Sequence, residues 1–214
     1  MSTPPLIRPY RGTPAEDRVA RRRAALLEAA LRVFEAEGWN GVSARRVCEE
    51  AGLTRRYFYE SFEDVDALLG ALLGEITGEV RAAVRAVVAD SDAPLAELTR
   101  RAVSTGLEVL LSTPVKGRFV AGARGAGGAV AAQQAAGMDD LASTVEATFA
   151  ARGGETPPVG TRQARVAAIG AVGAVLRIVD SWLNGEIDAT REEAVAWSTG
   201  AALAVLGAVA APLP

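Results

Sequence analysis

The apolar residues of this chain recur three and four positions apart over most of its length, which is the spacing of amphipathic helices. The first such stripe predicts a helix that begins near Thr13 and ends at Gly38, with an inner face formed by Leu27, Ala30, Leu31 and Phe34. No stretch alternates apolar and polar residues as a half-buried strand does. The pattern therefore predicts an all-α fold of about nine helices.

Two shorter helices are expected next. Val42 and Ser43 predict the start of the second helix, as a hydrophobic staple and a cap. Gly52 is expected to end it, and Thr54 is placed to cap a third helix over Arg55–Ser61. Two helices joined by a three-residue turn that contains glycine form a helix-turn-helix.

The third helix has two faces of different chemistry. Phe58 and Phe62, four residues apart, are expected to anchor it to the core. The remaining side chains lie on or near the exposed side, where they are available to a partner or form an ordinary solvated surface: Arg55, Arg56, Tyr57, Tyr59 and Glu60.

Beyond this unit, helices are expected over residues 64–89, 94–114, 138–152, 161–185 and 191–210. Residues 114–137 contain six glycines and are expected to be rich in loops. The glycine-rich run at 122–128 matches no phosphate-binding loop, because no strand precedes it and the spacing is wrong. The last two helices are lined with small residues that allow backbones to approach closely.

The composition excludes several kinds of chemistry. The chain has no histidine, and Cys48 is its only cysteine. Intrachain disulfides, zinc sites built from cysteine and histidine, and Ser-His or Cys-His catalytic pairs are therefore excluded. Cys48 is interpreted as a small buried apolar residue, with a reactive thiol as the alternative. We expect no cofactor, no metal and no enzyme, although chemistry that uses only carboxylates stays open through Asp139 and Asp140.

Charge is unevenly distributed along the chain. Residues 1–62 carry 11 arginines and 8 acidic residues, whereas residues 63–214 carry 12 basic and 18 acidic residues. A basic front on an acidic body suggests that a polyanion binds at one end.

Two features bear on location. The first twelve residues lack the apolar run of a signal peptide, so a cytoplasmic protein is expected. Residues 194–211 are long enough to span a membrane but consist mostly of alanine and glycine, so a buried helix is preferred over a membrane-associated hairpin.

Residues 26–73 resemble the DNA-binding domain of TetR/AcrR-type transcriptional regulators. The resemblance rests on Phe34-x-x-x-Gly38, Ser43-x-x-x-Val47, Ala51-Gly52-Leu53-Thr54, Phe58-Tyr59-x-x-Phe62 and Asp66-Ala67-Leu68-Leu69. The chain departs from the family pattern at Arg56, Ser61 and Val65, where members often have glycine, histidine and a basic residue. Arg56, or an N-terminal arm with Arg8 and Arg11, is expected to replace the lost phosphate contacts.

The resemblance implies a flexible basic arm over residues 1–17, a helix-turn-helix domain over 18–63 and an effector-binding and dimerisation domain over 64–214. The third helix is expected to enter the major groove of double-stranded DNA. Arg55 and Arg56 suit guanine or phosphate, and Thr54 and Tyr57 suit base edges. In the family, the positions of Ser43 and Tyr59 contact phosphate.

The resemblance also implies a homodimer on a two-fold operator, because two copies are needed to read enough base pairs. The interface is expected at the last two helices, through Gly170, Gly173, Gly200, Ala204 and Gly207, with packing inside one chain as the alternative. A small, largely apolar effector is expected among residues 64–185, where the candidate polar contacts are Arg118, Arg124, Asp180, Trp182 and Asn184. The function expected is that of a repressor that the effector releases from its operator. An effector-independent dimer, or an activator, is the alternative.

Overall fold

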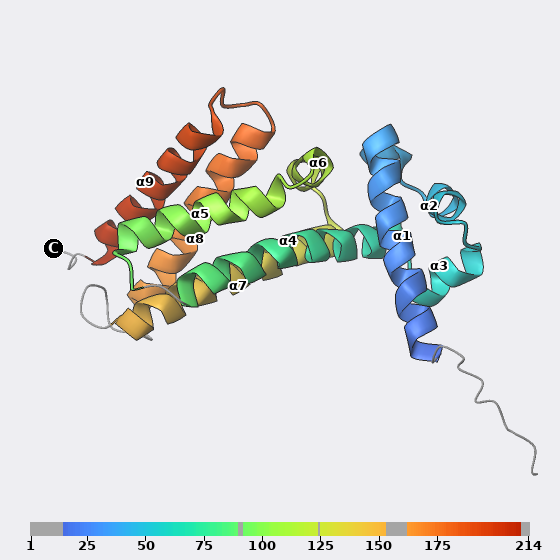
Figure 1. Ribbon diagram of the computed structural model, residues 1–214, viewed down its shortest axis with the longest axis horizontal. Helices are drawn as coiled ribbons and strands as arrows, with labels where there is room; N and C mark the ends of the chain where they lie inside the picture. Colours follow the sequence, from blue (N-terminus) through green and yellow to red (C-terminus); the bar gives the residue numbers. More distant parts are fainter. Residues whose placement is uncertain (1–14, 90–91, 124, 153–161, 211–214) are drawn as a thin grey trace, which may run out of the picture.

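The computed structural model describes residues 15–89, 92–123, 125–152 and 162–210, and all regular structure in these ranges is helical, as predicted. A small unit of three helices lies at one end of the molecule, and a larger helical body extends away from it (Figure 1). The small unit consists of α1 (Ala15–Glu37), the 3-10 turn η1 (Trp39–Gly41), α2 (Ala44–Ala51) and α3 (Arg55–Ser61). The body consists of α4 (Val65–Ala89), α5 (Leu95–Leu110), α6 (Pro114–Gly122), α7 (Gly128–Arg152), α8 (Arg162–Leu183) and α9 (Arg191–Ala210).

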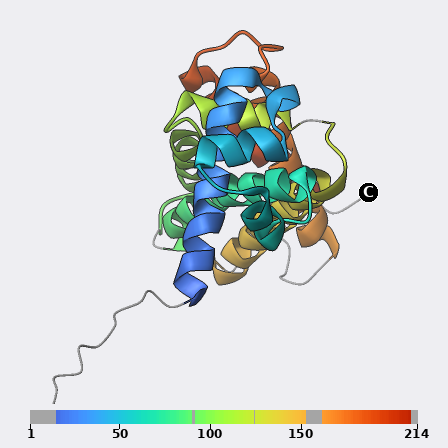
Figure 2. The same ribbon diagram turned by 90° about the vertical axis from the view of Figure 1, so that its right-hand side faces the viewer.

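The three helices of the small unit share one core with the start of α4. Leu26 of α1, Val47 of α2, Phe58 of α3 and Leu68 of α4 are all fully buried in it. These are inward positions of the predicted stripes, or their neighbours. Burial of a leucine or phenylalanine side chain on this scale stabilises a fold by about 2–5 kcal/mol relative to alanine. Seen end on, the unit lies across the end of the body (Figure 2).

The sequence predicts side-chain caps at Thr13, Ser43, Thr54 and Thr190, the last through a capping box with Glu193. The caps at Ser43 and Thr190 are present, and Thr13 lies outside the described residues. The Ser43 hydroxyl accepts a hydrogen bond from the Arg46 amide at 3.3 Å. Thr190 and Glu193 exchange reciprocal bonds of 2.8 and 3.2 Å at the start of α9. The cap predicted at Thr54 is wrong: its backbone is extended, as at an N-cap, but its side chain makes no capping hydrogen bond.

The prediction of a loop-rich segment over residues 114–137 is wrong. α6 occupies residues 114–122, and α7 begins at Gly128, ten residues before the predicted start. Tertiary contacts override the weak helix propensity of glycine here. The Asp66 carboxylate of α4 accepts a bond of 2.6 Å from the Ala129 amide and so caps α7 from outside.

α4 and α7 run side by side in the same direction along the body (Figure 1). Their first turns meet through the Asp66 contact, and Arg81 near the end of α4 forms an ion pair of 2.9 Å with Asp140 of α7. Gly70 lies so close to Ala129 that a Cβ added there would stand 2.9 Å from the alanine Cβ. The first helix of the body is therefore fixed to α7 along most of its length.

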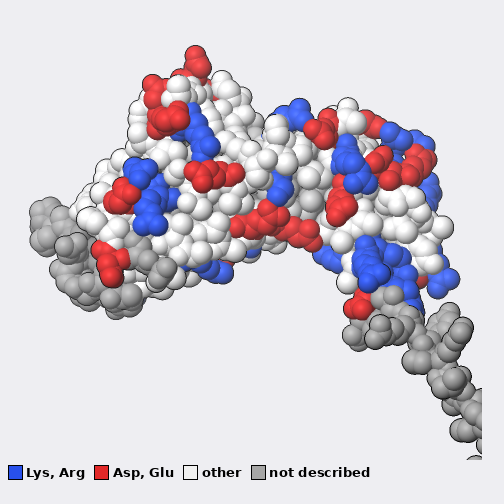
Figure 3. Space-filling model, in the orientation of Figure 1, with Lys and Arg blue, Asp and Glu red and all other residues white. Residues whose placement is uncertain are grey.

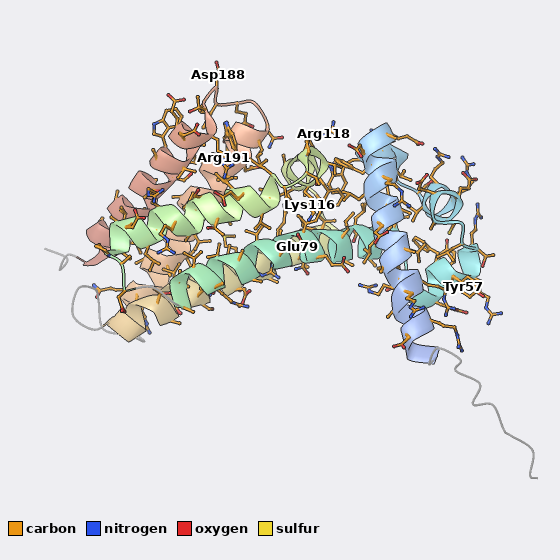
Figure 4. All side chains as sticks on the ribbon, viewed as in Figure 1. Tyr57, Glu79, Lys116, Arg118, Asp188 and Arg191 are labelled. Atoms are coloured by element: carbon orange, nitrogen blue, oxygen red, sulfur yellow. The ribbon has the colours of Figure 1, made fainter. Side chains whose placement is uncertain are left out.

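α6 connects the body to the small unit. The ring of Phe119, which is fully buried, stacks on Trp39 of η1 at 4.7 Å and meets Phe34 of α1 edge-on at 5.1 Å. Lys116 pairs with Glu79 of α4 at 2.5 Å, and the two side chains face each other between α6 and α4 (Figure 4). A shift of α6 would therefore change its contacts with both α1 and α4.

Candidate DNA-binding surface and ligand cavity

The turn between α2 and α3 has the geometry that Gly52 makes possible. Gly52 adopts the left-handed conformation with φ of 66°, which a side chain would strain. The Leu53 amide donates to the Cys48 carbonyl at 3.0 Å, which satisfies the end of α2. The chain then resumes a helical path at Arg55. The predicted helix-turn-helix is therefore present.

α3 presents its charged side to solvent. Phe58 is fully buried and Phe62 is 4% exposed, so the helix is anchored on one face, as predicted. On the opposite face the Arg56 side chain is 84% exposed, and Tyr59 is 60% exposed. Basic side chains are frequent over this end of the molecule, with acidic side chains between them (Figure 3).

Arg55 differs from its neighbours in its surroundings. Arg32, Arg45 and Arg46 form ion pairs with the carboxylates of Glu50, Glu49 and Glu37. Arg55 is exposed, and none of the ion pairs found among the described residues involves it. Its guanidinium group is therefore available to a partner without breaking an existing pair.

Two arginines of α1 that sequence reasoning did not single out hold α3 in place. The Arg23 guanidinium lies 4.3 Å from the centre of the Phe62 ring and donates to the Ser61 carbonyl at 3.3 Å. Arg22 lies 4.4 Å from the centre of the Tyr57 ring, so this tyrosine is partly covered. No local pattern in the sequence predicts these contacts, because the two arginines lie in α1 and the aromatic residues lie in or directly after α3.

The two remaining DNA-contact candidates in this unit lie at helix starts. Ser43 is partly buried, and its oxygen accepts the capping bond of α2 while its hydroxyl proton is free for an anion. Thr54 is exposed directly before α3. Arg8 and Arg11, the candidates in the N-terminal arm, lie outside the described residues.

A cavity of about 190 Å³ lies in the body between α4, α5, α7, α8 and α9. Its wall follows α5 from Leu95 to Leu110 and includes Val80 and Val84 of α4. Among the described residues no charged side chain contributes to the wall, which is formed almost entirely by valine, leucine and alanine side chains. A group that enters this cavity is therefore surrounded by hydrocarbon.

In the part of the wall that the structure describes, the only polar side chains are three threonines, and each hydroxyl is already bonded to its own helix. Thr99 donates to the Leu95 carbonyl at 2.8 Å, Thr144 to the Asp140 carbonyl at 3.0 Å, and Thr148 to the Thr144 carbonyl at 2.8 Å. These bonds use the hydroxyl protons, so the wall offers acceptors only.

The polar residues predicted to contact an effector do not line this cavity. Arg118 pairs with Glu35 of α1 at 3.6 Å. The Trp182 indole donates to the Ala189 carbonyl at 2.9 Å, and the Asn184 amide donates to Asp180 Oδ1 at 3.0 Å. Arg118 therefore joins α6 to α1, and the other three side chains form contacts within α8 and the connection from α8 to α9. Arg124 lies outside the described residues.

α8 and α9 pack on each other and leave one apolar face open. Four large apolar side chains of these helices are 40–58% exposed: Val166, Ile169, Leu176 and Trp197. A Cβ added at Gly173, Gly200 or Gly207 would meet no atom within 4 Å, and Ala204 is exposed. Gly170 is different, because an added Cβ would stand 2.8 Å from Val205 Cγ1 of α9. Gly170 therefore serves packing inside the chain.

One helix of the described chain is long and apolar enough to span a membrane. It is α8, in which an 18-residue window has a mean hydropathy of 1.7 and 33% of that window is buried, and not the 194–211 stretch considered from the sequence. Length and composition alone are weak evidence for a span, and the core helix of a folded domain meets the same criterion.

The acidic pair Asp139–Asp140 is held by arginines. Asp139 pairs with Arg165 at 2.8 Å, and Asp140 pairs with both Arg81 and Arg85. No group of metal-binding side chains occurs among the described residues. These contacts fit a role in joining α4, α7 and α8.

The anchored third helix and the glycine turn define a helix-turn-helix unit, which is joined to a larger helical body. Residues 26–72 match the family model described as bacterial regulatory proteins, tetR family. The resemblance expected from the sequence is thereby confirmed for the DNA-binding segment, and the chain shares the fold of TetR-family regulators over 89% of its length.

Solved structures show the same fold over nearly the whole chain. A protein assigned to the TetR family from Mesorhizobium loti MAFF303099 has a TM-score of 0.67 at 17% identity, over 89% of this chain and 98% of that chain. One from Syntrophomonas wolfei str. Goettingen has a TM-score of 0.68 at 16% identity, over 88% and 96%. The regulator FadR from Bacillus subtilis, in complex with stearoyl-CoA, has a TM-score of 0.60 at 14% identity, over 89% and 99%. No curated protein matches the chain significantly.

Proposed function

We propose that this chain is a cytoplasmic, homodimeric repressor that binds a two-fold DNA operator and is released by a small apolar effector. The observation that carries the DNA-binding part is the exposure of Arg55 and Arg56 on a helix whose phenylalanines are buried. Guanidinium groups on an exposed helix suit guanine in the major groove and phosphate beside it.

The contacts around α3 suggest different tasks for its side chains. Arg55 and Arg56 are exposed and read base edges or phosphate. Tyr59 is exposed and reaches phosphate, as does Ser43 at the start of α2, where the helix terminus favours anions. Tyr57 lies partly under Arg22, so it contributes one edge of its ring to the groove, next to Thr54.

The dimer forms through the open face of α8 and α9. Val166, Ile169, Leu176 and Trp197 supply apolar area, and the uncovered positions around Gly200 let a second copy approach closely. A contiguous exposed apolar face of this kind marks an interaction site on a protein surface. Self-pairing of this face places two α3 helices on one duplex about one turn, or a multiple of it, apart.

The effector binds in the cavity between α4 and α5. Its hydrocarbon wall favours an uncharged, apolar group, and this supports an effector-controlled regulator over an effector-independent dimer. The complex of FadR with stearoyl-CoA shows that a protein of this fold accommodates an acyl ligand. α4 joins the cavity to the DNA-binding unit, because it carries Val80 and Val84 and begins four residues after α3 ends.

A modest energetic preference is enough for release. An effector that favours the non-binding arrangement by roughly 3 kcal/mol lowers DNA affinity by about a hundredfold. Both α4 and the ring stack of Phe119 on Trp39 connect the cavity helices with the small unit.

Selection of bound sites from random double-stranded DNA tests the proposal. We expect a two-fold sequence motif with half-sites about one helical turn or a multiple apart, and an affinity that falls steeply with salt. Recovery of no motif, together with no salt-sensitive binding to any duplex, would overturn the DNA-binding function.

A further inference from the structure

Glu60 is the only carboxylate on α3, and it stands among the groups proposed to meet DNA. A negative charge at this surface is repelled by phosphate and by itself lowers affinity for every duplex. The contacts of Glu60 with two arginines suggest that it has a favourable role in DNA recognition that offsets this loss of affinity.

Glu60 connects two arginines that come from different helices. Its Oε1 accepts a hydrogen bond of 2.9 Å from Nε of Arg56, one turn earlier on α3. Its Oε2 lies 3.9 Å from an Nη of Arg22 on α1. Arg22 in turn lies over the ring of Tyr57. Arg22 of α1 therefore fixes the Glu60 carboxylate on one side, and the carboxylate fixes Arg56 of α3 on its other side.

The atom that Glu60 binds decides which edge of Arg56 is left for DNA. Because Nε of the guanidinium is occupied, the two terminal amino groups remain free on a side chain that is 84% exposed. Those two groups form the fork that bonds guanine O6 and N7 together. Without the carboxylate, a long exposed arginine samples many rotamers and contacts the nearest phosphate equally well.

We propose that Glu60 is a positioning residue for sequence reading: it orients Arg56 toward a base edge and weakens binding to DNA of the wrong sequence. This inference rests on the proposed function. It predicts that loss of Glu60 increases affinity for DNA in general while the preference for the correct sequence decreases.

The test compares variants of the full-length protein on two duplexes. One is the DNA selected by the wild-type protein from a random library, and the other is a scrambled duplex of the same composition. Fluorescence anisotropy gives the dissociation constant for each, and discrimination is the ratio of the scrambled to the selected value. Circular dichroism melting checks that each variant is folded.

Glu60→Ala removes both the charge and the hydrogen-bond acceptor. We expect tighter binding to the scrambled duplex and a loss of discrimination of about tenfold, the range of one good bidentate base contact. Glu60→Gln removes the charge but keeps an acceptor for Arg56 Nε, so it should tighten binding while discrimination stays near the wild-type value. Glu63→Gln is the matched control, because it removes one exposed carboxylate just beyond α3 and should leave discrimination unchanged.

A double-mutant comparison separates positioning from general electrostatics. In an Arg56→Ala background, Glu60→Ala should cause no further loss of discrimination, because the oriented side chain is gone. Equal losses in Glu60→Ala and Glu60→Gln, or wild-type discrimination in Glu60→Ala, would overturn the positioning role alone. A wild-type protein without any sequence preference would overturn the proposed function itself.

Discussion

At the scale of single residues, the surroundings of similar side chains decide their roles. Arg23 is committed to α3 through Phe62 and the Ser61 carbonyl, whereas Arg55 has an exposed guanidinium. Arg46 donates hydrogen bonds to Glu37 and Glu49 and so lowers the pKa of both carboxyl groups below the ordinary value. Sequence position alone does not separate these arginines, because all of them lie on amphipathic helices rich in charge.

Arg55→Ala should weaken DNA binding without loss of stability, because the side chain is exposed and makes no ion pair within the described structure. We expect about a 5- to 100-fold rise in the dissociation constant for the selected duplex, the range for one base or charged phosphate contact. Salt-dependent anisotropy titration measures it. Arg100→Ala on α5, which removes a charge far from α3, is the control and should bind like the wild type.

Cys48 should be unreactive in the folded protein. Its side chain is 5% exposed, and burial raises the pKa of the thiol, so little thiolate is available to attack a reagent. Titration with a chromogenic disulfide should show slow modification in buffer and rapid modification of one thiol in denaturant. Rapid reaction of the folded protein would contradict the interpretation of Cys48 as a core residue.

At the scale of elements, glycines in consecutive helices differ in the space that is available for a side chain. Gly106 of α5 has room for a methyl group, because an added Cβ would stand 3.5 Å from Val80 and from Val84. Gly122 at the end of α6 has none, because an added Cβ would stand 2.0 Å from Trp39 Nε1. The indole is held between Phe34 and Phe119 and cannot move aside cheaply.

Gly106→Ala should therefore stabilise the protein by about 0.5–1 kcal/mol, since alanine is the better helix former. Gly122→Ala should destabilise it by about 1–3 kcal/mol through overpacking against Trp39. Urea denaturation followed by circular dichroism measures both changes. A stabilised Gly122→Ala protein would show that the contact of α6 with η1 is looser than described.

At the scale of the whole molecule, a single chain exposes two surfaces that suit a binding partner: the exposed side of α3 and the open face of α8 and α9. The first carries fixed charge and the second carries apolar area, so they suit DNA and a second copy of the chain respectively. The cavity lies in the helical body, and α4, which forms part of its wall, begins four residues after α3 ends.

Gly200→Leu should produce a folded monomer with strongly reduced operator binding, because position 200 has open space in its own chain. Gly170→Leu is the contrasting variant: its side chain would collide with Val205, so it should lower stability rather than change assembly alone. Sedimentation equilibrium and thermal melting separate the two effects. A Gly200→Leu dimer of unchanged affinity would place the interface elsewhere.

Ala102→Phe should fill the cavity and abolish the response to apolar ligands while DNA affinity is kept, because Ala102 lines the cavity and belongs to α5, which lies away from α3 (Figure 1). Titration with stearoyl-CoA and with an uncharged long-chain alcohol, each in the presence of bound DNA, measures the response. Ala96→Phe, on the exposed side of the same helix, is the control and should respond like the wild type. Release of DNA from Ala102→Phe would contradict the cavity as the effector site.

The sequence by itself determined the all-α fold, the helix-turn-helix and the two faces of α3, because these depend on local spacing: apolar residues three and four apart, a serine cap and a glycine turn. It also indicated the family, because the motif from Phe34 to Leu69 is contiguous. Only the tertiary structure decided that residues 114–137 are largely helical, since Asp66 and Trp39 lie far away in the chain from the helices they contact. The same holds for the cavity wall, the α1 arginines against α3 and the separate role of Gly170. Each depends on which helices meet, and helical periodicity shows that a face is buried without showing what covers it.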